Sequence, residues 1–285
     1  GRSKIFLEGM ICSRDIIYFL LVIFMFLAFA FIKLQGERLK SSTLKTVGSY
    51  LIVFVFVLVG GYISSRPVMI VYYDATATKL NTLTKNSQEI VKKIDGGLTL
   101  TTYVNLLDDT WYHASPSSKN YDMDRFERYV RFKPDMKIEY VYYYGPGTSS
   151  HYDKVYKGLG PKERMLKVCE GYDYNPDMFI SAEEVQKVED ISAENGRIVR
   201  VFKRENGQKA YLRIYNDMYV HPFESEITAA LKTLVDKSPL IAFVTGHGER
   251  ACDDFGDRGY AAFAKNPTFR NALINQGFRV QDLTL

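Results

Sequence analysis

Cysteine, tryptophan and histidine are scarce in this chain of 285 residues, which contains three, one and four of them. Cys12, Cys169 and Cys252 form no C-x-x-C pair and no zinc-ligand spacing, so the chain is not a disulfide scaffold and allows one disulfide at most. The histidines show no H-x-x-x-H spacing, and we expect neither a metal site nor another cofactor. The sequence also lacks a Gly-x-Ser-x-Gly nucleophile elbow and the Gly-Lys-Ser/Thr of a phosphate-binding loop.

A basic bias is missing from most of the chain. Residues 1–66 contain eight Lys and Arg against three Asp and Glu, whereas residues 67–285 contain 29 against 30. Because nucleic-acid-binding domains concentrate positive charge on one face, this balance argues against nucleic acid as a partner.

Long apolar runs, in contrast, are present near the N-terminus. Residues 16–32 are seventeen in a row without a charge, and residues 46–65 are twenty. Seventeen helical residues span about 26 Å, close to the hydrocarbon core of about 30 Å. We therefore predict that residues 1–66 form a transmembrane helical hairpin. A signal peptide ending near Ala28-Phe29-Ala30 and a pair of buried helices in a soluble domain are the alternatives.

The segment between the two runs indicates the orientation of the hairpin. Lys33–Thr46 is short and carries four Lys or Arg against Glu37. Short basic loops between membrane spans face the cytoplasm. Both ends of the hairpin then lie on the other side, so residues 67–285 are predicted to be extracytoplasmic, and membrane lipid is an expected partner.

The remainder alternates between patterns typical of strands and of helices. Asn206-Gly207 between two β-rich runs is a strong hairpin signal. The order of elements is that of a thioredoxin-like domain, which we assign to residues 67–237. The predicted strands cover residues 68–73, 98–107, 136–144, 197–204 and 208–215, and the predicted helices cover residues 83–94, 122–132, 161–170 and 222–236.

A second α/β domain is predicted to start at residue 238. Residues 239–245 form an apolar run typical of a central, buried strand, and we expect helices at 260–264 and 268–276 before another strand from residue 278. This is the first β-α-β unit of a doubly wound domain of the flavodoxin or amidotransferase kind. We expect the chain to be a piece of a longer protein, cut at both ends.

The first candidate site is the loop after the strand at 98–107. A thioredoxin has a reactive cysteine pair there, where this chain has Trp111, Tyr112 and His113. We therefore expect no redox activity and regard the three side chains as a candidate contact surface. The alternative is an ordinary loop whose aromatic side chains pack onto the domain.

The second candidate site is the turn Gly246-His247-Gly248-Glu249. It follows a strand at the edge where open α/β sheets bind ligands, and its glycines permit a tight turn. We predict that His247 serves binding or interdomain contact and that Glu249 orients it. A purely structural turn is the alternative.

Parts of the chain resemble known transporter components. Residues 9–19, Gly-Met-Ile-Cys-Ser-Arg-Asp-Ile-Ile-Tyr-Phe, with the apolar run after them, resemble the last span of an ABC-2 type permease. Asn81-Thr82-Leu83-Thr84 and the Thr-Gly-His-Gly-Glu turn at 245–249 resemble the auxiliary component of gliding-motility-associated ABC transporters. The resemblance implies a bacterial inner-membrane complex with permease helices, a separate ATPase subunit, and a closing span beyond Leu285.

These observations lead to two functional hypotheses. The first is a membrane-anchored, non-catalytic accessory subunit of an ABC-type transporter, which handles substrate or couples the complex to a cell-envelope partner. The second is a cell-envelope hydrolase that uses His247 and Glu249 as an acid–base pair.

Overall fold

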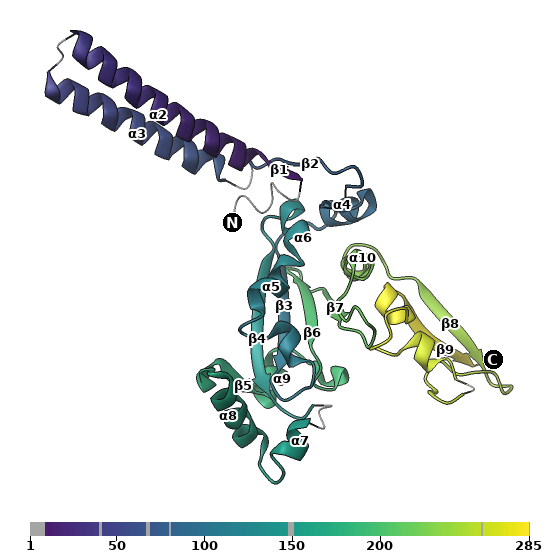
Figure 1. The fold of residues 1–285 in the computed structure, drawn as a ribbon. Coiled ribbons are helices and arrows are strands. Elements are labelled where there is room, and N and C mark those ends of the chain that lie inside the picture. Colours follow the sequence, from purple (N-terminus) through teal and green to yellow (C-terminus); the bar gives the residue numbers. More distant parts are fainter. Residues whose placement is uncertain are drawn as a thin grey trace. The chain divides into compact units, whose positions relative to one another are not determined.

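The computed structural model describes residues 9–39, 42–66, 69–79, 81–147, 151–257 and 259–284 (Figure 1). The chain divides into two compact units, Gly1–Leu83 and Thr84–Leu285. The architecture is mixed α/β, with two long apolar helices in the first unit and a mixed β-sheet in the second. The predicted domain boundaries after residues 66 and 237 stay predictions.

Two antiparallel helices, α2 (Ser13–Leu39) and α3 (Thr43–Ser64), dominate the first unit. Both are long and apolar enough to cross a membrane. Their large side chains face outward, with Leu27 65% and Ile52 70% exposed, and water solvates such a surface poorly. The connection is shorter than the predicted 33–46, because both helices continue beyond the apolar runs.

The two helices pack against each other through aromatic and small residues. Phe29 meets Tyr50 edge to face, with ring centroids 5.1 Å apart. A Cβ on Gly60 would stand 3.3 Å from a methyl group of Leu21. Glycine at this position therefore allows the close helix approach that is typical of membrane proteins.

A short antiparallel pair, β1 (Met10–Cys12) and β2 (Tyr72–Asp74), joins the ends of the hairpin. Ser13 supports it: its backbone N–H donates to Val71 O, and its hydroxyl accepts from Val71 N, each at 2.9 Å. The segments before α2 and after α3 thus lie side by side, as the predicted topology requires. The prediction that strand 68–73 belongs to the sheet of 98–107 is wrong, because the helices bring this β-rich run to residues 10–12 instead.

A five-stranded sheet in the order β5-β4-β3-β6-β7 forms the centre of the second unit. β3 (Leu98–Asn105) is parallel to β4 (Lys137–Tyr144) and antiparallel to β6 (Val199–Arg204). The edges are β5 (Phe179–Ser181), parallel to β4, and β7 (Lys209–Arg213), antiparallel to β6. The predicted hairpin is confirmed, with Gly207 at φ 86° in the turn between β6 and β7.

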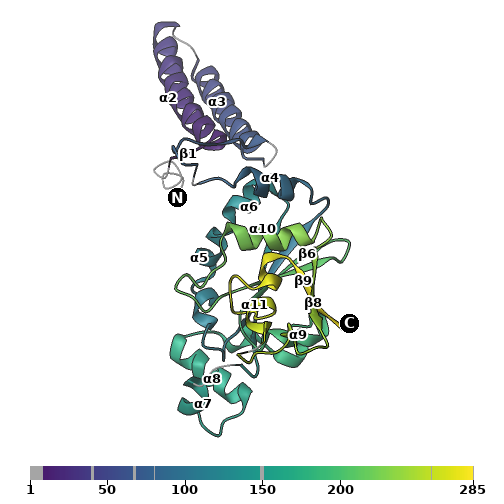
Figure 2. The same ribbon diagram turned by 90° about the vertical axis from the view of Figure 1, so that its right-hand side faces the viewer.

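Short helices connect these strands. Figure 2 shows α7 and α8 at the end of the sheet opposite to α4 and α10. The single helix predicted over 122–132 is broken into two short helices around Arg125-Phe126. The helices are α4 (Lys85–Lys92), α5 (Lys119–Asp124), α6 (Glu127–Phe132), α7 (His151–Val155), α8 (Pro161–Tyr172), α9 (Ala182–Val188) and α10 (Glu224–Thr233), with 3-10 turns η2 (Trp111–Ala114), η3 (Pro176–Met178) and η4 (Ser192–Glu194).

The sheet buries a core on each face, because successive side chains of a strand point to opposite sides. One core contains Val104 of β3, Tyr142 of β4 and Ile198 directly before β6, together with residues of α8 and η2. The other core contains Tyr103, Tyr143, Val199 and Val201, covered by Val185 of α9 and by Ile191. The loops that follow β3 and β4 can therefore contact α8 and η2 on one face of the sheet and α9 on the other.

A separate two-stranded parallel sheet consists of β8 (Leu240–Thr245) and β9 (Arg279–Thr284), with α11 (Ala261–Ala264) and η5 (Leu273–Gln276) between them. The side chains of β8 alternate between exposed and half-buried. The prediction of a central, buried strand is wrong for the described residues, where β9 is the one strand that pairs with β8 and the apolar run is not covered on both faces. The helix predicted at 268–276 is reduced to η5.

Arg270 ties the chain between β8 and β9 to the segment around α10. Its guanidinium donates to Asp217 through Nε (2.7 Å) and Nη2 (3.0 Å), and to Glu226 Oε2 (2.7 Å). The ring centroids of Tyr215 and Phe223 lie 4.5 and 4.3 Å from its guanidinium carbon. One side chain thus combines two ion pairs with two aromatic contacts.

Candidate functional site

The loop after β3 holds its tryptophan inside the domain. Asp108 shapes the turn by accepting from the backbone N–H of Thr110 at 2.9 Å and from its hydroxyl. Trp111 is 5% exposed, and its Nε1 donates to the Tyr152 hydroxyl at 3.1 Å. Trp111 therefore fixes the loop to the core, and of the three predicted contact residues Tyr112 is the most exposed, at 56%.

His113, the third residue of that candidate surface, turns toward a buried polar cluster. Its ring meets that of His221 edge to face, with centroids 5.1 Å apart. Nδ1 of His221 lies 3.8 Å from Oδ1 of Asp122, a fully buried carboxylate. Asp122 also pairs with fully buried Arg200 at 2.7 Å and accepts from the Tyr140 hydroxyl at 2.8 Å.

Both imidazoles of this cluster are neutral at pH 7. Burial and, to a smaller extent, the positive charges of Arg200 and Arg125 together lower the pKa of His221 to about 3. Burial, followed by the same two arginines, also lowers the pKa of His113. Because Asp122 and Arg200 are closed to solvent, substrate does not reach them, and we interpret the cluster as structural. The local patterns of the sequence do not reveal it, since Asp122 and Arg200 are 78 positions apart.

The turn after β8 is exposed, as predicted. Gly246 has φ 127° and Gly248 φ 87°, a region that favours glycine. Glu249 shapes the turn, because its Oε2 accepts from the backbone N–H of His247 at 2.6 Å. Nδ1 of His247 lies 3.7 Å from Oε1 of Glu249, with 70% and 39% of the two side chains exposed. This turn and the Trp111 loop follow strands of two different sheets.

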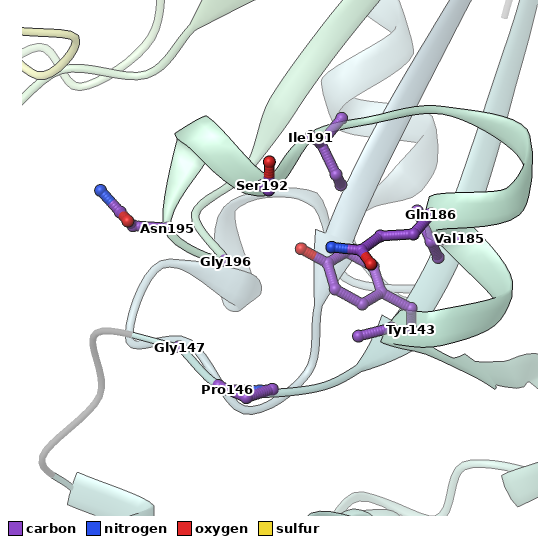
Figure 3. A pocket seen from close by; sticks show the side chains of 10 residues that line it. Tyr143, Pro146, Gly147, Val185, Gln186, Ile191, Ser192, Asn195 and Gly196 are labelled. Atoms are coloured by element: carbon purple, nitrogen blue, oxygen red, sulfur yellow. The ribbon is translucent and has the colours of Figure 1, made fainter.

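A groove of about 440 Å³ opens beside the ends of β3 and β4 (Figure 3). Its polar groups include the hydroxyl of Tyr143 and the side-chain amide of Gln186. The sequence predicts Tyr143 only as part of the strand at 136–144 and indicates no role for Gln186, although Gly145-Pro146-Gly147 directly after a strand is a signal for a loop at a ligand-binding edge. The residues that line the groove are Tyr143, Pro146, Gly147, Ala182, Val185, Gln186, Ile191, Ser192, Asn195 and Gly196.

The end of the groove depends on a close approach of two loops. The buried Asn105 side chain donates to Gly145 O (3.2 Å) and Pro146 O (3.3 Å), and it accepts from Gly145 N at 3.2 Å. A Cβ on Gly196 would stand 2.5 Å from Pro146 O, and Gly196 has φ 76°. Glycine is therefore required at this position to close the end of the groove.

The cysteines and acidic groups give no further reactive site in the described ranges. There, no group of three or more His, Cys, Asp or Glu side chains is placed to hold a metal ion. Cys12, Cys169 and Cys252 are buried free thiols. Burial raises the pKa of the Cys169 and Cys252 thiols, which reduces their reactivity.

Comparison with protein-family models gives no match, and neither does comparison with curated proteins or with solved structures.

Proposed function

We propose that this chain is a membrane-anchored, non-catalytic accessory subunit of a bacterial ABC-type transporter, with residues 67–285 outside the cytoplasm. The apolar exterior of α2 and α3 carries this proposal, because neighbouring lipid or permease helices would cover it. The resemblance to auxiliary components of gliding-motility-associated transporters supports it further. A separate ATPase subunit is the expected partner.

We further propose a thioredoxin-like scaffold for the part of the second unit up to residue 237, without the strand at 68–73 that the sequence predicted as its first. Parallel β3 and β4, antiparallel β6 and β7, and the following α10 provide the support. At the place of the cysteine pair the chain has η2, whose Trp111 packs inward. In this proposal the loop contacts a partner through Tyr112 instead of exchanging disulfides. The β8-α11-β9 unit would be the start of a doubly wound domain.

Cysteine labelling in intact cells tests the orientation. We expect a membrane-impermeant maleimide to label Ser117→Cys, since Ser117 is exposed and on the predicted outer side. Ser41→Cys should react only after the membrane is made permeable, because the positive-inside rule places it in the cytoplasm. Labelling of position 41 but not of position 117 would reverse the proposed topology.

Purification of the native complex tests the partner. A tagged chain extracted with mild detergent should retain an ABC ATPase subunit and permease helices in defined stoichiometry. Leu27→Asn is the comparison variant and should retain less of the ATPase and the permease helices, because its amide on the outward surface of α2 weakens packing against neighbouring helices. Recovery of the wild-type chain without any ATPase would contradict the transporter role.

The competing hydrolase hypothesis has one observation in its favour, the 3.7 Å separation of His247 and Glu249. A purified chain that cleaves an envelope glycan or peptide, and loses this activity as His247→Ala, would establish that alternative. We expect no such activity, because the pair lies open to solvent, where electrostatic catalysis is weak.

A further inference from the structure

The hydroxyl of Tyr143 lines the groove and has no hydrogen-bond partner among the described residues. Tyr143 is 3% exposed, and Figure 3 shows its hydroxyl directed into the groove. The side chain is therefore held by the core while its hydroxyl remains open to a molecule in the groove. Burial raises the pKa of Tyr143, and the charges of Asp108 and Glu194 add to this effect. The hydroxyl therefore stays protonated and can donate to a ligand.

The remaining lining describes the chemistry of that ligand. The Gln186 amide also lines the groove and offers one donor group and one acceptor. Ala182, Val185 and Ile191 contribute an apolar wall. None of the ten lining residues is charged, so the groove does not favour a phosphate or a carboxylate.

We propose that this groove binds an uncharged, N-acetylated saccharide. An acetamido group has a methyl group for the apolar wall and an amide that pairs with Gln186, and sugar hydroxyls can accept from Tyr143. A volume of about 440 Å³ lies within the range of small-molecule sites. This inference is independent of the transporter proposal.

An extended peptide fits the groove less well. Peptides commonly bind by adding a strand to a free sheet edge. Tyr143 lies between two strand neighbours, Asn105 on β3 and Ile180 on β5, so its backbone offers no free edge. A ligand at Tyr143 must therefore bind through side-chain contacts, which favours a compact ligand over an extended peptide.

Titration of the full chain with di-N-acetylchitobiose tests the proposal, in a detergent without a sugar headgroup and by calorimetry. We expect saturable binding in the micromolar to millimolar range. Tyr143→Phe and Gln186→Ala should each weaken it by at least about threefold, since each removes one neutral hydrogen bond. Lys187→Ala, on the same helix but outside the groove, is the matched control and should bind like wild type.

Two further probes separate ligand classes. Cellobiose, which lacks the acetamido groups, should bind at least about threefold more weakly than di-N-acetylchitobiose. An N-acetylated, amidated trialanine should not compete. If Tyr143→Phe fails to fold, shown by altered fluorescence of Trp111, Gln186→Ala alone decides. Absence of saturable saccharide binding, insensitivity to Gln186→Ala, equal affinity for cellobiose, or preference for the peptide would each overturn the proposal.

Discussion

Replacing Arg270 by methionine should destabilise the second unit by about 3 kcal/mol. In the folded chain Arg270 pairs with Glu226 at 2.7 Å and with Asp217 at 2.7 Å. Methionine keeps an apolar side chain beside Tyr215 and Phe223 but removes the charge and every hydrogen bond. The expected loss therefore comes mainly from two carboxylates left without their cation.

The two carboxylates contribute unequally because they differ in burial. The Glu226 side chain is 3% exposed, and breaking a buried ion pair costs about 3–5 kcal/mol. Glu226 keeps hydrogen bonds from Phe223 N at 2.8 Å and from the Ser225 hydroxyl at 2.6 Å, which favours the lower end of that range. The Asp217 side chain is 35% exposed, and loss of its pair should add less than about 1 kcal/mol.

Urea unfolding in micelles, followed by fluorescence, measures this loss. The chain has a single tryptophan, and Trp111 is buried in the second unit, so the signal reports unfolding of that unit alone. Exposed Arg250→Met is the control and should change stability by less than about 0.5 kcal/mol. The double variant Arg270→Met/Glu226→Gln should recover at least about 1 kcal/mol relative to additivity. A single variant as stable as wild type, or no recovery in the double variant, would refute the reasoning.

Three further predictions concern other parts of the second unit and use the same unfolding measurement. The pKa of His221 is about 3 when folded and about 6.5 when unfolded, so the unfolded chain takes up the proton first. The free energy of unfolding should therefore fall between pH 7 and pH 5, by up to about 2 kcal/mol. Solvent screening reduces the expected fall to about 1 kcal/mol, because the His221 side chain is 11% exposed. His221→Gln should flatten this pH dependence, and an unchanged slope would contradict the assignment. Gly196→Ala should lower the free energy of unfolding by about 1–3 kcal/mol, because the new Cβ would stand 2.5 Å from Pro146 O. The control Gly171→Ala, whose Cβ would have no atom within 4 Å, should be neutral or stabilising by up to about 1 kcal/mol. Equal effects of the two substitutions would contradict the close approach at Gly196. His247→Ala should stay within about 0.5 kcal/mol of wild type, since the side chain is 70% exposed, and a larger loss would make His247 a structural residue.

Local patterns predicted much of the secondary structure. The two uncharged apolar runs became α2 and α3, and the strands at 98–107 and 136–144 became β3 and β4. Asn206-Gly207 predicted the β6–β7 hairpin, because few other residue pairs adopt that turn without strain. These features depend on residues close together in the chain, where periodicity and turn chemistry act directly.

Pairing between distant segments was decided only in three dimensions. The β-rich run near residue 70 could join any strand edge, and the helical hairpin delivers it to residues 10–12. Likewise, five apolar residues in β8 indicate burial only if other elements cover both faces of its sheet, and in the described chain its side chains alternate between exposed and half-buried.

The candidate sites follow the same division. Glycines at 246 and 248 indicated an exposed turn from the sequence, because their positive φ angles are a local requirement. The burial of Trp111 depends on Tyr152, 41 positions away, and the groove depends on α9 and the loop before β6 meeting the end of β4. Local sequence therefore determined which segments turn or extend, and the tertiary structure decided which side chains are buried and which line a binding site, because burial is set by contacts between segments that are remote in sequence.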